Sequence, residues 1–259
     1  MNPLNKFVKK LLTDIRLVFF PIHCMVCGRR LSPNEKHICV ACLMDFPHTY
    51  YDASPGNPIE RLFWGKIPII KANALFFYHS QNAYTNLITQ LKYNQRTDLG
   101  LYLGRLMAKQ VSNTDFFKNI DYIIPVPLAK QRVRKRGYNQ CEYIAKGIQD
   151  ITAIPIHTKA IQRCKNNPTQ THLTREERIL NVADIFKLSQ PLDVHKHHEL
   201  ENKHVLLIDD VLTTGSTIMA CASVLATIPN IKISIYTAAV AGRHGAGVDF
   251  DKEVFDVDL

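Results

Sequence analysis

The sequence predicts an α/β fold in which a largely parallel β-sheet is flanked by helices. Apolar residues run without interruption through segments such as 122–126 and 205–208, which is typical of strands buried on both faces of a sheet. Helix-like segments of ten to fifteen residues separate the apolar runs, as in repeated strand–helix units. Hydrophobic residues make up 46% of the 259 residues, which is enough for a packed core and argues against general disorder.

The chain divides into five regions in this interpretation. Apolar residues recur at helical spacing through the first region, and cysteines occur in pairs in the second. Prolines and a glycine mark the third region as a linker that wraps rather than folds. The fourth region carries the alternating strands and helices, and the fifth is a polar tail. These regions are residues 1–20, 21–47, 48–70, 71–245 and 246–259.

The expected elements of the fourth region follow its hydrophobic pattern. The strands are 74–78, 122–126, 205–208 and 231–240, and the helices are 82–92, 97–111, 139–151 and 215–227. The stretch 187–204 contains a proline, several charged residues and histidines, so we expect a surface loop there.

The first region is predicted to be an amphipathic helix. Charged residues such as Lys9, Lys10 and Asp14 interrupt its apolar positions, whereas a membrane-spanning helix needs about 20 mostly apolar residues. A signal peptide would need a longer uncharged core. We therefore expect no membrane span and a helix that packs on its own protein, with contact at a membrane surface as the alternative.

Two Cys-x-x-Cys pairs, Cys24 with Cys27 and Cys39 with Cys42, are separated by eleven residues. Four thiolates at this spacing predict a closed tetrahedral Zn²⁺ site, which is structural because no coordination position is left open. The metal would supply the folding free energy of a module with little core of its own. An iron–sulfur cluster is the alternative. Clustered pairs among seven cysteines favour a reducing compartment, and therefore a cytoplasmic protein, over a disulfide framework.

The most informative segment is VLLIDDVLTTGST, residues 205–217. A buried strand delivers Asp209 and Asp210 to its carboxyl end, which is the edge where open α/β sheets bind ligands. The carboxylates can accept hydrogen bonds from vicinal sugar hydroxyls or hold a hydrated Mg²⁺. The turn that follows opens a helix, so it offers backbone N–H groups and the helix dipole to a phosphate. Its residues are Thr213, Thr214, Gly215, Ser216 and Thr217. Together these features predict a ribose 5-phosphate site.

Two other interpretations of this segment are weaker. A buried strand followed by a capped helix would explain a hydroxyl at Thr214 or Ser216, but it would not explain two adjacent carboxylates. A nucleoside triphosphate site of the P-loop type needs a Gly-x4-Gly-Lys-Ser/Thr motif, and the sequence contains none.

Positive charge is concentrated after the strand 122–126. The formal net charge is +9, and the stretch 130–178 contains eleven basic residues against four acidic ones, which suits phosphates on a small molecule or on nucleic acid. Within it, Lys130, Arg132 and Arg136 are predicted to bind a diphosphate, and Gly137 allows the turn into the next helix. A solvated basic loop is the alternative. The expected position at the same sheet edge as Asp209 favours the diphosphate site.

Residues 163–181 have few apolar side chains before Ile179, which makes a core element improbable. A polar loop with this charge could close over a diphosphate and exclude water, or it could be an ordinary surface excursion. The candidate lid residues are Arg163, Lys165, Gln170, Arg175 and Arg178.

The segment LLIDDVLTTGST, residues 206–217, is similar to the signature of type I phosphoribosyltransferases. With PVPLAKQRVRKRGYNQ (125–140), PTQTHLTREERILN (168–181) and the cysteine pairs, it resembles the ComF family of phosphoribosyltransferase-like proteins from about residue 4 to 242. The loop 187–204 and the tail beyond Gly242 depart from the family pattern without touching the motifs. The resemblance implies a type I phosphoribosyltransferase-like domain with a small N-terminal four-cysteine zinc ribbon. It also implies a link to DNA uptake in natural transformation, beside a DNA-translocating ATPase in the cytoplasm.

Two functional hypotheses follow. In the first, the protein binds phosphoribosyl diphosphate with Mg²⁺ and transfers phosphoribose to an acceptor that no residue set identifies. In the second, a catalytically silent protein binds single-stranded DNA or serves as a scaffold for the DNA-translocating ATPase, with the zinc ribbon as the docking element. Aromatic residues for base stacking are few in the basic stretch, chiefly Tyr138 and Tyr143, which weakens the DNA hypothesis.

Overall fold

The computed structural model describes residues 21–51, 55–79, 82–93, 95–164, 185–189 and 199–241. The chain forms two compact units, Met1–Phe46 and Pro47–Leu259. The helix expected in residues 1–20 and the tail from residue 246 lie outside the described residues. No helix in the described ranges has the length and apolar character that crossing a membrane requires.

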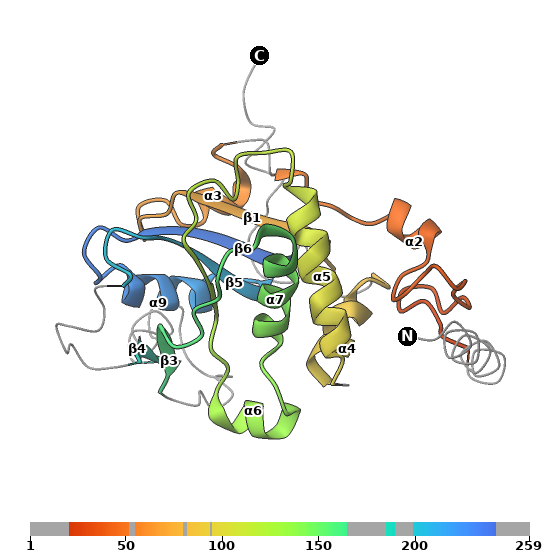
Figure 1. Ribbon diagram of the computed structural model, residues 1–259. Coiled ribbons are helices and arrows are strands. Elements are labelled where there is room, and N and C mark those ends of the chain that lie inside the picture. Colours follow the sequence, from red (N-terminus) through yellow and green to blue (C-terminus); the bar gives the residue numbers. More distant parts are fainter. Residues whose placement is uncertain are drawn as a thin grey trace, which may run out of the picture. The chain divides into compact units, whose positions relative to one another are not determined.

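A four-stranded parallel sheet forms the centre of the larger unit (Figure 1). The strands lie in the order β1-β6-β5-β2. Their bounds are β1 Lys71–Tyr78, β2 Tyr122–Pro125, β5 His204–Leu212 and β6 Lys232–Ala241. The parallel sheet predicted from the apolar runs is therefore confirmed.

At their carboxyl ends, the two central strands extend further than the short edge strand β2. The pairing of β2 with β5 ends at Pro125 and Ile208, whereas β5 continues to pair with β6 as far as Leu212. The strand predicted over 205–208 was therefore too short at its carboxyl end, because pairing with β6 holds four more residues extended. As a result, Asp209 and Asp210 lie just past the end of β2, where β6 is the one strand among the described residues that pairs with β5.

Helices cover both faces of the sheet. On one face lie α4 (Thr85–Tyr93), α5 (Thr97–Gln110) and α7 (Gln140–Thr152), and α5 and α7 run side by side (Figure 1). On the other face lies α9 (Ser216–Leu225). The alternation along β6 shows this division, because Tyr236 donates to the Met107 carbonyl oxygen of α5 while Ile235 packs in the core cluster that contains α9.

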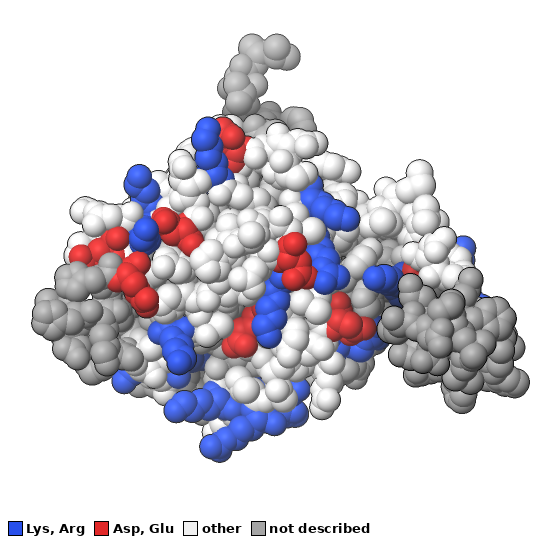
Figure 2. All heavy atoms as spheres, in the orientation of Figure 1, with Lys and Arg blue, Asp and Glu red and all other residues white. Residues whose placement is uncertain are grey.

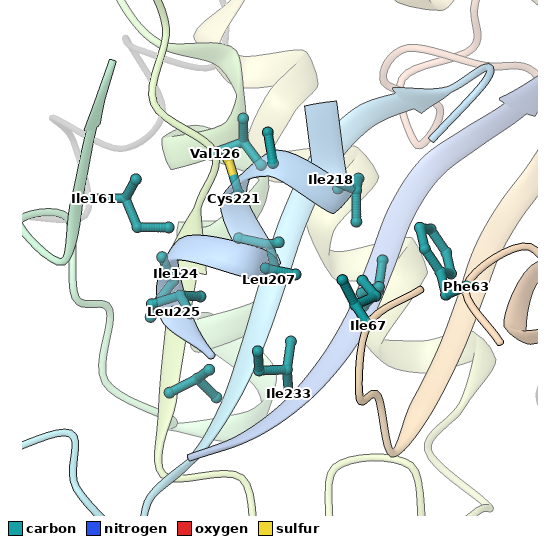
Figure 3. Packing of buried hydrophobic residues seen from close by; sticks show 14 of the residues in the cluster. Phe63, Ile67, Ile124, Val126, Ile161, Leu207, Ile218, Cys221, Leu225 and Ile233 are labelled. Atoms are coloured by element: carbon teal, nitrogen blue, oxygen red, sulfur yellow. The ribbon is translucent and has the colours of Figure 1, made fainter. Parts of the chain in front are cut away.

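The core beneath α9 is formed by residues distant in the sequence (Figure 3). Leu207 and Ile233 from the sheet pack with Ile218 and Leu225 of α9. Phe63, fully buried, joins them from the region expected to be a linker. That region also contains α3 (Pro58–Arg61), which Asn57 caps by accepting the N–H groups of Ile59 and Glu60. Residues 55–70 thus fold into the larger unit, contrary to the prediction that they only wrap around it.

Three further elements of the larger unit, one helix and two strands, were not predicted. The basic stretch forms the helix α6 (Lys130–Arg136), which ends at Gly137 with φ of 83°, a left-handed conformation that glycine adopts without strain. An antiparallel pair, β3 (Ile161–Arg163) and β4 (Phe186–Leu188), lies beside α9. The stretch 187–204 therefore begins in a strand, although residues 190–198 lie outside the described residues.

The smaller unit is described from residue 21 to 46. Its first cysteine pair lies in a turn that an isolated bridge between His23 and Arg30 closes. Gly28 has φ of 73° and its N–H donates to the Cys24 carbonyl oxygen at 2.9 Å. The second pair spans the start of the short helix α2 (Val40–Met44).

Candidate functional site

Asp209 and Asp210 are the two buried carboxylates of the sheet edge, with 8% and 6% of their surface exposed. Because successive side chains of a strand point to opposite faces, the two neighbours meet different surroundings. Asp210 lies against α4 and α7. Asp209 contacts Cys141 at the start of α7 and lies near Cys221 of α9.

One amide donor and one cation contact the same oxygen of Asp210. Gln140 Nε2 donates to Asp210 Oδ2 at 2.9 Å, and Lys92 Nζ lies 3.2 Å from the same atom. Arg136 Nη1 in turn donates to Gln140 Oε1 at 3.1 Å. Among the described residues, Asp210 Oδ1 has no such partner, so this oxygen remains available to a ligand.

Asp209 is held in a similar way from its own side. Its Oδ1 accepts the backbone N–H of Asp210 at 2.9 Å and lies 3.4 Å from Cys141 Sγ. Within the described part of the chain, its Oδ2 has no hydrogen-bond partner. Burial, followed by the negative charge of Asp210, raises the pKa of Asp209 to about 7, because both disfavour the ionised form.

The hydroxyl-rich turn connects β5 to α9 at the same edge. Gly215 has φ of 75° and is buried, and an added Cβ would lie 3.3 Å from the Phe63 ring. The N-cap residue Gly215 offers no side-chain acceptor, and the Ser216 N–H makes only a long contact of 3.5 Å with Thr214 Oγ1. Among the described residues, no side chain accepts the next N–H groups of the first turn, so these groups and the helix dipole are available to an anion. The turn residues Thr213 and Thr214 are exposed, and Ser216 and Thr217 are partly exposed. This arrangement suits an anion.

The predicted diphosphate residues lie on or beside α6. Lys130 and Arg132 are exposed, and Arg136 is partly exposed at the helix end that faces Gln140. Figure 2 shows Lys and Arg side chains gathered over α6, at the lower edge of the molecule. Because α6 contains no acidic residue, its positive field is uncompensated within the helix.

Arg163 is the one lid candidate within the described residues. It lies at the end of β3, with its guanidinium 5.2 Å from the Phe186 ring centre. Burial and the nearby charge of Arg132 lower its pKa. Arg163 also lines a cavity of about 330 Å³ with Lys130 and Lys159, and the lining includes no acidic residue. Lys165, Gln170, Arg175 and Arg178 lie outside the described residues.

The sequence interpretation did not assign Lys92, Tyr93 or Gln140 to the site. The helical pattern indicates the position of Lys92, since it follows buried Ile88 by four residues and so lies on the same face of α4. Gln140 stands in the motif that carries the family resemblance, but only the fold shows that it reaches Asp210.

The four paired cysteines of the smaller unit form a separate candidate metal centre. The Sγ atoms of Cys24, Cys27, Cys39 and Cys42 all lie within 4.8 Å of one another. A tetrahedral site with metal–sulfur bonds of about 2.3 Å needs sulfur separations of about 3.8 Å, and Cys27 and Cys39 are 3.7 Å apart. The backbone N–H of Cys42 lowers the pKa of Cys39 to about 6. The residues therefore fit a metal ion bound by four thiolates.

Comparison with known proteins shows which family the chain belongs to. Residues 99–258, more than half of the chain, match the family model described as "Phosphoribosyl transferase domain". The chain is 28% identical to Competence protein F of Haemophilus influenzae over 238 residues, which cover 86% of this chain and 99% of that protein. It is 27% identical to DNA utilization protein YhgH of Shigella flexneri over 205 residues, 78% of this chain and 83% of that protein.

Among solved structures, glutamine phosphoribosylpyrophosphate amidotransferase from B. subtilis, complexed with ADP and GMP, is similar to 57% of this chain. The identity is 16% and the TM-score 0.37, and the chain spans 30% of that structure. The family is shown by the matched domain and the relatives. The chain belongs to the phosphoribosyl transferase domain family and is a ComF-type phosphoribosyltransferase-like protein.

Proposed function

We propose that the protein binds 5-phosphoribosyl 1-diphosphate with Mg²⁺ at the carboxyl end of β5. The observation that carries the proposal is the pair Asp209 and Asp210. Each carboxylate has one oxygen held by the protein and one without a partner among the described residues. Although the two side chains leave the strand on opposite faces, both contact the start of α7, at Gln140 and Cys141. Two such oxygens suit the two adjacent hydroxyls of a ribose.

The remaining groups of the ligand have matching residues. The N–H groups at the start of α9 and the hydroxyls of the turn would bind the 5-phosphate. Lys130, Arg132 and Arg136 of α6 would bind the diphosphate, and Gly137 allows the chain to turn there. Arg163 would contribute to closure over the diphosphate, as would the lid residues outside the described ranges. These residues are Thr213, Thr214, Gly215, Ser216, Thr217, Lys130, Arg132, Arg136, Gly137, Arg163, Lys165, Gln170, Arg175 and Arg178.

The arrangement also suits transfer of the phosphoribosyl group. When C1 loses diphosphate, the bond from C1 to oxygen breaks, and positive charge develops on the sugar while negative charge develops on the leaving group. Mg²⁺ bound to the diphosphate would neutralise part of that negative charge. Fixed cations on α6 would stabilise the rest, and this electrostatic contribution is usually the largest in catalysis.

Isothermal titration with phosphoribosyl diphosphate and Mg²⁺ tests the proposal. The wild type is expected to bind, and Asp209→Asn/Asp210→Asn is expected to bind at least about 100-fold more weakly, since a hydrogen bond to a charged group contributes about 1.5–3 kcal/mol. Asp115→Asn is the matched control, because the Asp115 side chain is 77% exposed and pairs with Lys118. Absence of binding by the wild type would contradict the proposal. Release of diphosphate in the presence of trial acceptors would measure transfer separately.

A second candidate function is supported by the exposed charge of α6. Lys130, Arg132, Arg134 and Lys135 are all exposed on this helix, and two relatives carry names that refer to competence and to DNA utilization. We propose that the protein acts in DNA uptake and that α6 contacts single-stranded DNA through its phosphates.

Fluorescence anisotropy with a labelled single-stranded oligonucleotide would test this second function. Arg134→Ala/Lys135→Ala is expected to weaken DNA binding. It should also reduce the log–log slope of affinity against salt concentration by about 0.7 for each phosphate that the variant no longer neutralises. The same variant should leave binding of phosphoribosyl diphosphate unchanged, because neither residue is among those assigned to that ligand. DNA affinity equal to that of the wild type would argue against a role for α6.

For the smaller unit, we propose that the metal is Zn²⁺ and that its role is structural, because the four thiolates leave no open position. The DNA-translocating ATPase and the cytoplasmic location stay predictions.

A further inference from the structure

Five residues form a circuit beside the site, in which side-chain contacts supply every link except the peptide bond between Lys92 and Tyr93. Lys92 and Gln140 both contact Asp210 Oδ2, at 3.2 and 2.9 Å. Gln140 Oε1 accepts from Arg136 at 3.1 Å, and the Arg136 guanidinium lies 5.4 Å from the centre of the Tyr93 ring. Lys92 and Tyr93 are neighbours at the end of α4, so the circuit returns to its start.

The chemistry of the circuit fixes the orientation of Gln140. An arginine offers only donors, and an ionised aspartate offers only acceptors. With Arg136 on one side and Asp210 on the other, only one orientation of the Gln140 amide satisfies both partners. Gln140 is 5% exposed and Asp210 is 6% exposed, so an unsatisfied group here would be costly. The amide therefore fixes the separation between Arg136 and Asp210.

α4 gives this arrangement two further attachments. Lys92, whose side chain is 26% exposed, contacts the Asp210 carboxylate. The Tyr93 ring supports the Arg136 guanidinium through a cation–π contact. Both residues precede the part of the chain that matches the family model, residues 99–258. Two residues outside the matched domain thus contact Asp210 and Arg136 of the site.

We propose that Lys92, Tyr93 and Gln140 are positioning residues that fix Asp210 and Arg136 relative to each other. They would thereby make the site prefer a ligand that carries both a ribose diol and a diphosphate over ribose 5-phosphate alone. The inference rests on the proposed function, in which Asp210 meets the ribose and Arg136 the diphosphate. Preorganisation of this kind improves affinity because the ligand need not order the side chains as it binds.

Affinities for two ligands, phosphoribosyl diphosphate with Mg²⁺ and ribose 5-phosphate, test the inference in each variant. Gln140→Met keeps the side-chain length and removes both hydrogen bonds. We expect its affinity for phosphoribosyl diphosphate to fall about tenfold, as loss of roughly one charged hydrogen bond implies. Its affinity for ribose 5-phosphate should change by less than about threefold, since Lys92 still holds Asp210. The ratio of the two affinities is therefore the decisive quantity.

Conservative variants separate positioning from mere structural support. Tyr93→Phe keeps the ring beside Arg136 and should preserve the ratio of the affinity for phosphoribosyl diphosphate to the affinity for ribose 5-phosphate. Tyr93→Leu should lower this ratio. Lys92→Arg keeps the charge and should retain most of the binding that Lys92→Met loses. Thermal unfolding of each variant identifies any that lose the fold. Because Tyr93 is exposed, its two variants are expected to disturb the fold least.

The outcomes distinguish this inference from the function beneath it. If the wild type binds neither ligand, the proposed function is wrong and the inference is overturned with it. If the wild type binds but Gln140→Met and Tyr93→Leu leave the affinity ratio unchanged, the inference alone is overturned. Equal losses for both ligands, or failure of Lys92→Arg to retain binding, would also overturn it, because they indicate structural support without selectivity.

Discussion

Cys141 Sγ lies 3.4 Å from Asp209 Oδ1, at the buried junction between α7 and the end of β5. The same oxygen accepts the backbone N–H of Asp210. Despite these contacts and the nearby Lys92, burial and the charge of Asp210 raise the pKa of Asp209 to about 7. The site therefore holds a carboxyl group whose pKa lies near neutral pH.

This titration predicts a dependence of stability on pH. The unfolded Asp209 has an ordinary pKa near 3.8, and the folded group has one of about 7. Between these values the folded state keeps a proton that the unfolded state has released, so the free energy of unfolding attributable to Asp209 falls as the pH rises from about 4 to about 7. Above that range its contribution is constant. Urea unfolding at several pH values measures the effect.

The effect of Asp209 is isolated by a difference between variants. Glu35 has the opposite sign, since backbone N–H groups lower its pKa to about 2. Asp209→Asn should therefore gain stability relative to the wild type as the pH rises to 7, while Asp115→Asn should follow the wild type. A constant difference between Asp209→Asn and the wild type across this range would show that Asp209 does not titrate there.

The thiol of Cys141 is predicted to be unreactive in the folded protein. Burial raises its pKa well above the ordinary value, and the charges of Asp209 and Asp210 act in the same direction. Alkylation requires the thiolate, so iodoacetamide at pH 8 should modify exposed Cys164 and spare Cys141 until the protein is denatured. Peptide mass spectrometry checks this. Modification of both residues at similar rates would mean that the junction opens readily.

The pattern of the sequence predicted the sheet because its strands are buried on both faces and so lack alternation. It predicted Asp209 and Asp210 as candidates because the carboxylates, the turn and the helix start are contiguous in the chain. Their role as a binding site stays a proposal. α3 was not predicted because its four residues are too few to show a periodic pattern.

The contacts of the carboxylates could not be predicted in the same way. Gln140 and Asp210 are 70 residues apart in the sequence, and Lys92 comes from a third element. A spacing rule describes neighbours within one helix or strand, whereas these contacts depend on how α4 and α7 pack on the sheet. The packing of α7 against α5 depends in turn on Gly100, Gly104 and Gly147.

Gly104→Ala is predicted to destabilise the larger unit through the contact of α5 with α7. A Cβ at this position would lie 2.0 Å from the Ile144 carbonyl oxygen and 2.9 Å from Gly147 Cα, so the helices would have to separate. We expect a decrease of about 1–3 kcal/mol in the free energy of unfolding, as for other overpacked positions. Lys109→Ala, at an exposed position of the same helix, should change it by less than about 0.5 kcal/mol. Equal effects of the two substitutions on urea unfolding would contradict this close packing.

The cysteine cluster is predicted to bind one Zn²⁺ per chain and to require it for folding of the smaller unit. The four thiols lie within 4.8 Å of one another. Within residues 21–46 the buried apolar side chains other than cysteine are those of Ile38 and Phe46, so we expect the metal to supply the folding free energy. Elemental analysis should find one zinc in the wild type and in Cys164→Ser, and substantially less in Cys24→Ser. Removal of the metal by a chelator should collapse the chemical-shift dispersion of residues 21–46 in NMR spectra, while the dispersion of the sheet residues persists. Iron with visible absorption would instead indicate an iron–sulfur cluster, and dispersed signals of residues 21–46 that survive the chelator would exclude a structural role for the metal.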